Sequence, residues 1–147
     1  MANSAQPRIV VGVDSSPASE QALRWAIGYA KLTGGTVHAI AAWEYPAFYG
    51  WAGLSAPPPE GLNPEELAGQ ALSETVRRVA GDDAGVLISE AVMPGNAAKA
   101  LLDAAKGAAL VVVGSRGLGG FTGALLGSVS RHLTEHAPCP VVVVRED

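Results

Sequence analysis

Cysteine and charge are scarce in this sequence, and long apolar runs are missing. Its single cysteine, Cys139, allows no internal disulfide and no CxxC metal site. Only 16% of the residues are charged, the net charge is −4 and no basic stripe exists, which argues against a nucleic-acid-binding protein. Without a transmembrane-length run or the apolar core of a signal peptide, we expect a cytoplasmic protein. The hydrophobic share of 48% can supply one core, so we expect a single domain over residues 1–147.

Short runs of β-forming residues alternate with segments of helical length. The runs are 8–13, 36–42, 86–92, 110–113 and 140–144. Four of them are almost continuously apolar, which is typical of parallel strands covered by helices on both faces. The run 86–92 alternates more, so we expect it nearer an edge of the sheet.

Helix signals fill the gaps between these runs. They are the cap-and-proline pairs Ser16-Pro17 and Asn63-Pro64, the cap Asn96, and the amphipathic segment 128–136. Strands and helices therefore alternate along the chain. With right-handed crossovers this order predicts an α/β protein built on an open, doubly wound parallel sheet.

One connection, 43–62, is much longer than the usual spacer in such folds. It holds five of the eight aromatic residues, followed by three consecutive prolines. The segment is either an irregular stretch packed over a helix or a lid or partner-binding surface, and the sequence leaves both readings open.

The segment 111–131 is rich in glycine and contains no Lys, His, Asp or Glu. It leaves a predicted strand tip at Gly114 and returns to a predicted helix N-terminus at Ser128. Free N–H groups and the helix dipole favour an anion at such a place, and glycine lets a ligand approach the backbone. A flexible turn without a ligand is the alternative. Neither the Gly-Lys-Ser/Thr of a P-loop nor a GxGxxG dinucleotide motif is present.

The glycines follow the pattern Gly114-x2-Gly117-x9-Gly127-Ser128. With the opening IVVGVDSSPASEQAL and the closing APCPVVVV, this pattern resembles the ATP-binding branch of the universal stress protein family over essentially the whole chain. The resemblance implies a five-stranded parallel sheet of the Rossmann-like, adenine nucleotide alpha hydrolase-like type, with strand order 3-2-1-4-5. It also implies a stress-response sensor or regulator.

The resemblance further implies how an adenine nucleotide would bind. Asp14 would lie against adenine and ribose, and the backbone of Ala42 would contact adenine. The glycines and Ser128 would hold ribose and phosphates, with Arg116 and Ser130 alongside. The complete set of expected nucleotide-binding residues is Val13, Asp14, Ala42, Val113, Gly114, Arg116, Gly117, Gly127, Ser128, Val129 and Ser130.

The ligand and the chemistry remain partly open at this stage. Arg116, Arg131 and one helix dipole do not neutralise a triphosphate, so ATP binding calls for Mg²⁺ as a supplement. AMP and cyclic AMP would need less compensation and stay as alternatives, as does a nucleotide-independent interaction module that uses 43–62.

The loop has no residue to orient water and no Lys for a β/γ-phosphate, so we expect no catalytic residues and at most slow hydrolysis. Signatures of nucleotidyl-transferring enzymes are missing.

Three further features carry smaller expectations. His132 and His136 lie four residues apart on the last helix, a spacing that fits a solvated face better than a metal site. Cys139, between two prolines, is interpreted as a buried structural thiol. The resemblance places the last strand, 140–144, at an edge, where four valines would favour association. It thereby implies a homodimer through residues 140–145.

Overall fold

Five parallel strands form one sheet within the residues that this computed structural model describes, which are 6–43, 63–81, 85–116 and 126–145. They are β1 (Arg8–Gly12), β2 (Thr36–Trp43), β3 (Ile88–Pro94), β4 (Leu110–Gly114) and β5 (Val141–Val144). Their order is β3-β2-β1-β4-β5, so the predicted order 3-2-1-4-5 is confirmed. The order reverses between β1 and β4, which is where open α/β sheets bind ligands, beyond the carboxyl ends of the strands.

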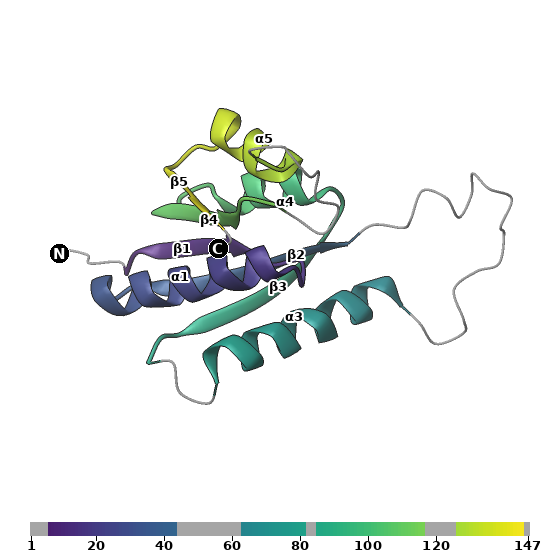
Figure 1. Cartoon of the computed structure of the whole chain (residues 1–147), viewed down its shortest axis with the longest axis horizontal. Helices are drawn as coiled ribbons and strands as arrows, with labels where there is room; N and C mark the ends of the chain where they lie inside the picture. Colours follow the sequence, from purple (N-terminus) through teal and green to yellow (C-terminus); the bar gives the residue numbers. More distant parts are fainter. Residues whose placement is uncertain (1–5, 44–62, 82–84, 117–125, 146–147) are drawn as a thin grey trace, which may run out of the picture.

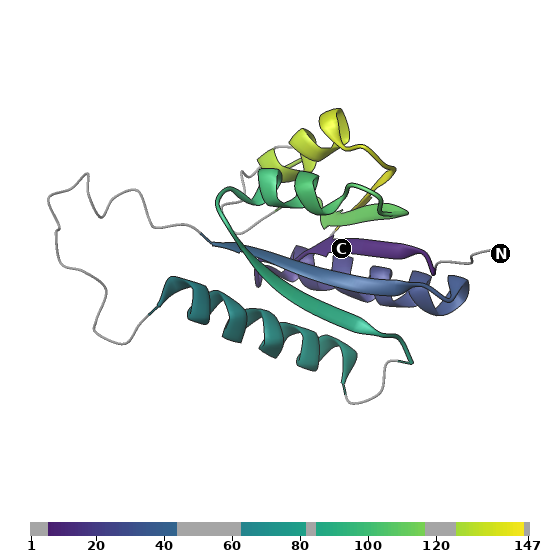
Figure 2. The same ribbon diagram turned by 180° about the vertical axis from the view of Figure 1, so that it is seen from behind.

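Helices cover both faces of this sheet (Figures 1 and 2). Helices α1 (Pro17–Thr33) and α3 (Pro64–Ala80) lie on one face. Helices α4 (Ala97–Ala104) and α5 (Ser128–His136) lie on the other. This two-sided cover explains why the inner strands contain so few polar residues.

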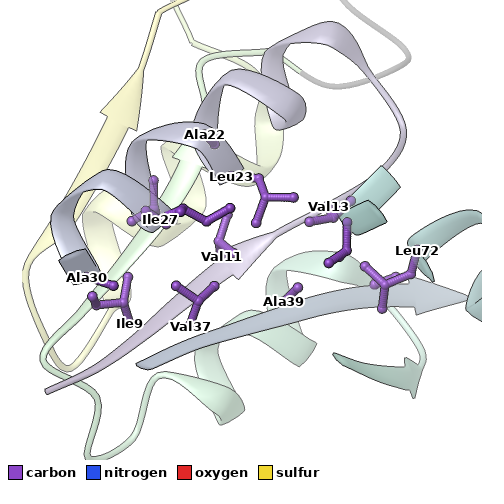
Figure 3. Close-up of a cluster of buried hydrophobic side chains, with 14 of the residues drawn as sticks. Ile9, Val11, Val13, Ala22, Leu23, Ile27, Ala30, Val37, Ala39 and Leu72 are labelled. Atoms are coloured by element: carbon purple, nitrogen blue, oxygen red, sulfur yellow. The ribbon is translucent and has the colours of Figure 1, made fainter. Parts of the chain in front are cut away.

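The larger core lies between α1, α3 and the sheet (Figure 3). The inner face of α1 is mostly alanine, with Leu23 and Ile27 reaching the strands. Ile9, Val11 and Val37 meet it from β1 and β2. Small residues on the helix let it lie close to the central strands, and this close approach fixes where α1 begins relative to the end of β4.

Side chains cap three of the four described helices at their N-termini. The caps are Ser16, which accepts from Ser19 N–H; Asn63, which accepts from Glu65 N–H; and Asn96, which accepts from the N–H groups of Ala98 and Lys99. The first two helices also have the expected proline in the first turn. The N-cap of helix α5 is Gly127, which has no side chain to cap the helix.

The edge strands agree with expectation in position and differ slightly in extent. The alternating strand β3 is at one edge and β5 is at the other, as predicted. β3 runs Ile88–Pro94, two residues later than the predicted run 86–92, because its register follows the long strand β2 from Val37↔Ile88 to Trp43↔Pro94. Apart from Trp43, which ends β2, the aromatic connection 43–62 lies outside the described residues.

Candidate functional site

The carboxyl ends of three adjacent strands bring the predicted site residues to one edge of the sheet. β1 lies between β2 and β4, with Gly12 paired to Ile40 and Val11 paired to Val112. Continuing each register by two residues places Asp14 opposite Ala42 and Gly114 opposite Val13. Asp14, Ala42 and Gly114 therefore lie at the same edge of the sheet, within one residue of the same level. Asp14 is exposed, whereas Ala42 and Gly114 are half-buried.

Asp14 begins a tight turn into α1. Its Oδ1 accepts hydrogen bonds from the backbone N–H (3.0 Å) and the hydroxyl of Ser16, while its own N–H donates to Ser19 Oγ at 3.2 Å. Ser15, between them, has φ 68°, a left-handed conformation that is uncommon outside glycine. The turn fixes the carboxylate at the start of α1, and its Oδ2 accepts no hydrogen bond from the described residues.

Gly114 owes its glycine identity to packing against α1. A Cβ at this position would lie 2.7 Å from both the carbonyl carbon and the Cβ of Ala18, and 2.8 Å from its carbonyl oxygen. Backbone atoms cannot yield as the tip of a side chain can, so only glycine fits. The contact holds the first turn of α1 against the end of β4, next to the root of the glycine loop.

The two ends of the glycine loop are joined at the carbonyl group of Ser115. The N–H of Gly127 donates to Ser115 O at 2.7 Å, and the buried hydroxyl of Ser130 lies 3.3 Å from Ser115 O and 3.1 Å from Gly127 O. Ser115 N–H in turn donates to Val144 O of β5 at 2.9 Å. The base of the loop is thus closed by the protein itself, and Gly127 N–H and Ser130 Oγ face inward to this closure.

The N-terminus of α5 therefore presents the first-turn amides that follow Gly127. No side chain of the described residues caps them, and Ser128, the first residue of the helix, is exposed. Arg116 lies just beyond Ser115 and is also exposed. N–H groups, the positive end of a helix dipole and a guanidinium near one strand tip form an arrangement suited to an anion.

The remaining predicted site residues have apolar surroundings or lie outside the description. Val13 is packed into the core beneath α1 and Val113 into the cluster beneath α4 and α5, so only their backbones could meet a ligand. Val129 is half-buried and packs against the second of these clusters. Gly117 lies outside the described residues. Sequence reasoning missed Ser115, whose role depends on contacts with Gly127, Ser130 and Val144 and leaves no local signal.

The histidines and the cysteine belong to no metal-binding cluster within the part of the chain that the structure describes. Among the described residues no group of three or more His, Cys, Asp or Glu could hold an ion. The rings of His132 and His136 lie 4.6 Å apart on exposed positions of α5. Cys139 is half-buried rather than buried, and burial raises the pKa of its thiol despite the opposing effect of Arg8, which favours the unreactive protonated form.

His38 makes stability depend on pH. Burial, and then the Arg8 guanidinium, lower its pKa from the ordinary value of 6.5, while its Nδ1 shares a 2.8 Å hydrogen bond with Ser89 Oγ. The unfolded chain therefore binds this proton more readily than the folded chain. We expect the contribution of His38 to the free energy of unfolding to fall as pH drops through about 6.5 and to level off below the lowered pKa. Urea unfolding between pH 5 and 8 should show a flatter profile for His38→Gln than for the wild type; parallel profiles would contradict this.

The comparison with known proteins identifies the family. The sequence model of the universal stress protein family matches residues 7–145. The chain belongs to this family. A universal stress protein of Mycobacterium tuberculosis strain H37Rv is 37% identical over an alignment of 147 positions that covers 95% of this chain and 48% of that protein. The chain thus spans about half the length of the curated relatives it matches.

Solved structures of universal stress proteins share the fold. One from Lactobacillus plantarum is 24% identical, covers 97% of this chain and 100% of its own, and has a TM-score of 0.74. Another, solved in complex with cAMP, is 27% identical, covers 96% of this chain and 98% of its own, and has a TM-score of 0.67. Within the described residues, no helix is both long and apolar enough to cross a membrane.

Proposed function

We propose that this universal stress protein binds an adenine nucleotide, ATP with Mg²⁺, at the edge formed by the ends of β1, β2 and β4. The observation that carries the proposal is the missing cap of α5, where the other described helices have Ser16, Asn63 and Asn96. An uncapped first turn leaves N–H groups that a phosphate can satisfy. The universal stress protein solved with cAMP supports an adenine nucleotide as the ligand class.

The charges at the site favour one orientation of the nucleotide. The carboxylate of Asp14 accepts hydrogen bonds and repels phosphate, so it suits the hydroxyl groups of ribose or the amino group of adenine. The phosphates then lie at the other side, near Ser128 and Arg116, where N–H groups and positive charge are available. Ala42 at the end of β2 would face the base through its backbone.

The protein supplies too little positive charge for a triphosphate on its own. Only Arg116 lies at the described root of the loop, with Arg131 one turn into α5, both exposed. Without a protein metal cluster among the described residues, Mg²⁺ would be held mainly by phosphate oxygens and water, and the exposed Ser128 hydroxyl is one protein oxygen that could join them. Bound Mg²⁺ would neutralise phosphate charge, while the chain's own groups would bind and orient the nucleotide.

Cyclic AMP or AMP is the second candidate ligand, because a universal stress protein similar to this chain was solved with cAMP. A single phosphate needs only the α5 amides and one arginine. In either case, we propose a sensor or regulator that acts in the cytoplasm as a homodimer joined through β5. Fast catalysis is not expected, since no His or carboxylate other than Asp14 lies among the predicted site residues.

A proline at the first position of α5 tests whether the helix amides bind phosphate. Ser128→Pro removes one N–H at a helix position that tolerates proline, and Gly127 already has the extended backbone that precedes a proline (ψ 172°). We expect calorimetry to show ATP binding at least ~10-fold weaker for Ser128→Pro than for Ser128→Ala, the loss of one charge-assisted hydrogen bond.

The matched Ser128→Ala variant accounts for the hydroxyl, so the difference reports the N–H alone. The same titrations with Mg²⁺ and with EDTA separate the ligands: Mg²⁺ should strengthen ATP binding and leave cyclic AMP binding unchanged. Equal affinities of the Pro and Ala variants would mean that the Ser128 N–H of α5 does not bind phosphate. No binding of any adenine nucleotide to the wild type would refute the proposal as a whole.

A further inference from the structure

We propose that an aromatic flank on α1, formed by Trp25 and Tyr29, meets a second copy of the chain and completes the interface that begins at the β5 edge. The inference rests on the proposed pairing through β5 and names a separate surface, on a helix, as part of the same contact. Neither residue belongs to the expected nucleotide site.

The position of the flank follows from the contact between Ala18 and Gly114. Residues 18, 22, 25 and 29 follow one side of α1 at helical spacing. Ala18 lies against Gly114 at the end of β4, so this side of the helix faces β4 and β5. The opposite flank faces α3, because Glu20 pairs with Arg78 there. Tyr29 and the β5 residues Val142 and Val144 pack against the same core cluster.

The flank is aromatic, partly exposed and held by a contact between its two rings. The rings of Trp25 and Tyr29 stack with centroids 5.1 Å apart and planes 10° apart. Trp25 nevertheless remains 37% exposed, and Leu32, one further turn along the same stripe, is 87% exposed. A stacked pair loses little conformational entropy when a partner covers it, which favours it as a contact site.

The β5 edge needs such a supplement. Its four valines are only half-buried, and its outer backbone groups face no other strand among the described residues. A specific interface covers about 800 Å² on each partner, which is some 20 residues. Four residues of β5 cannot supply this area, so surfaces beside the strand have to contribute.

In a two-fold dimer paired through β5, the two α1 helices would lie on the same side of the joined sheet. α1 lies mainly over β4 and β1 and also contacts β2 and β5. If β5 pairs antiparallel with β5 of a second copy, strands about 4.8 Å apart then place the two α1 axes roughly 15–20 Å from each other. Helices in direct contact lie about 8–10 Å apart, so large side chains have to fill the space between them. Trp25 follows Ala18 by seven residues, which places it about 10 Å further along the helix. Because Ala18 lies against the carboxyl end of β4, Trp25 reaches the middle of β4 and of the neighbouring strand β5 along the strand direction. Trp25 and Tyr29 have the size and direction to fill this space.

Sedimentation velocity over a range of concentrations tests the proposal. We expect a dimeric wild type, and at least ~30-fold weaker dimerisation for Trp25→Ala, as for a central interface tryptophan. The matched control is Leu87→Ala, since Leu87 is 73% exposed and lies beside β3 at the opposite edge of the sheet. It should dimerise like the wild type. Hydroxyl-radical footprinting of the wild type should show Trp25 oxidation decreasing as protein concentration rises.

The possible failures are distinguishable. Val143→Pro disrupts strand pairing at the edge and should give monomers. If Val143→Pro is monomeric while Trp25→Ala dimerises like the wild type and footprinting of Trp25 is independent of concentration, the α1 flank lies outside the interface and this inference is wrong. If the wild type is monomeric at all concentrations, the β5 pairing fails as well, whereas nucleotide binding is judged separately by calorimetry.

Discussion

A Gly114→Ala variant should lose about 3 kcal/mol of unfolding free energy, the upper part of the range for overpacked sites. The added Cβ would come within 2.7 Å of the carbonyl carbon of Ala18 and 2.8 Å of its oxygen. These are backbone atoms of α1, so the helix or the strand has to move. Urea unfolding measures the loss, and nucleotide affinity should fall with it because the same contact positions Asp14 beside the loop root.

Three other variants separate this clash from a general effect of alanine. Gly28→Ala adds a Cβ with nothing within 4 Å on an exposed helix position and should stabilise by about 1 kcal/mol. The Cβ of Gly12→Ala would meet side-chain atoms and no backbone, with Leu101 Cδ1 at 2.8 Å and Val113 Cγ1 at 3.5 Å, so this variant should cost less than Gly114→Ala. Ala18→Gly should not rescue Gly114→Ala, because the carbonyl group remains. Wild-type stability of Gly114→Ala would contradict the packing argument.

A Leu133→Ala variant should lose about 3 kcal/mol, within the usual range for a leucine that leaves a cavity. Leu133 is fully buried, and it and Ser130 are the only residues of α5 that are. Leu133 is thus the only large, fully buried side chain of α5, and Val129 contacts the same cluster from a half-buried position. Loss of this packing would also loosen the N-terminus of α5. The free energy of nucleotide binding should therefore fall by more than the free energy of unfolding.

Hydrogen exchange distinguishes local from global loosening in this variant. Amides of α5 should exchange faster in Leu133→Ala, while those of α1 keep protection close to the global stability of the variant. Leu23→Ala is the matched control, since Leu23 is equally buried but attaches α1 to the centre of the larger core. Its effect should spread through the fold. Unchanged α5 protection in Leu133→Ala would mean that other contacts hold the helix.

The fold was accessible from the sequence because its signals are local. Apolar runs without alternation marked β1, β2 and β4 as covered strands, and cap residues such as Ser16 and Asn63 marked helix starts. The end of β3 was placed less well, because pairing with β2 carries it to Pro94. Proline is tolerated there because the strand is at an edge and ends at that residue. Strand ends depend on partners, which a single segment does not reveal.

The candidate site was accessible only in outline. Glycine spacing located both ends of the loop and the start of α5, but not the reason for each residue. Gly114 is glycine because of Ala18, and the hydroxyl of Ser130 is engaged with Ser115 and Gly127. Both facts arise from contacts between distant parts of the chain. The expected ligand came from the family resemblance. The contacts show that Gly127 N–H is already bonded to Ser115, so the amides available to a phosphate are those that follow Gly127.

The base of the glycine loop is closed by hydrogen bonds that do not involve the residues between Arg116 and Leu126. Hydrogen bonds at Ser115 already bring the two ends together, so the entropic cost of joining them is met by the scaffold and changes little with the length between them. Segments of other composition could therefore be grafted between Arg116 and Leu126 without rebuilding the sheet. The same frame could present a different binding sequence at one strand tip, a route by which ligand choice could diverge while the core stays constant.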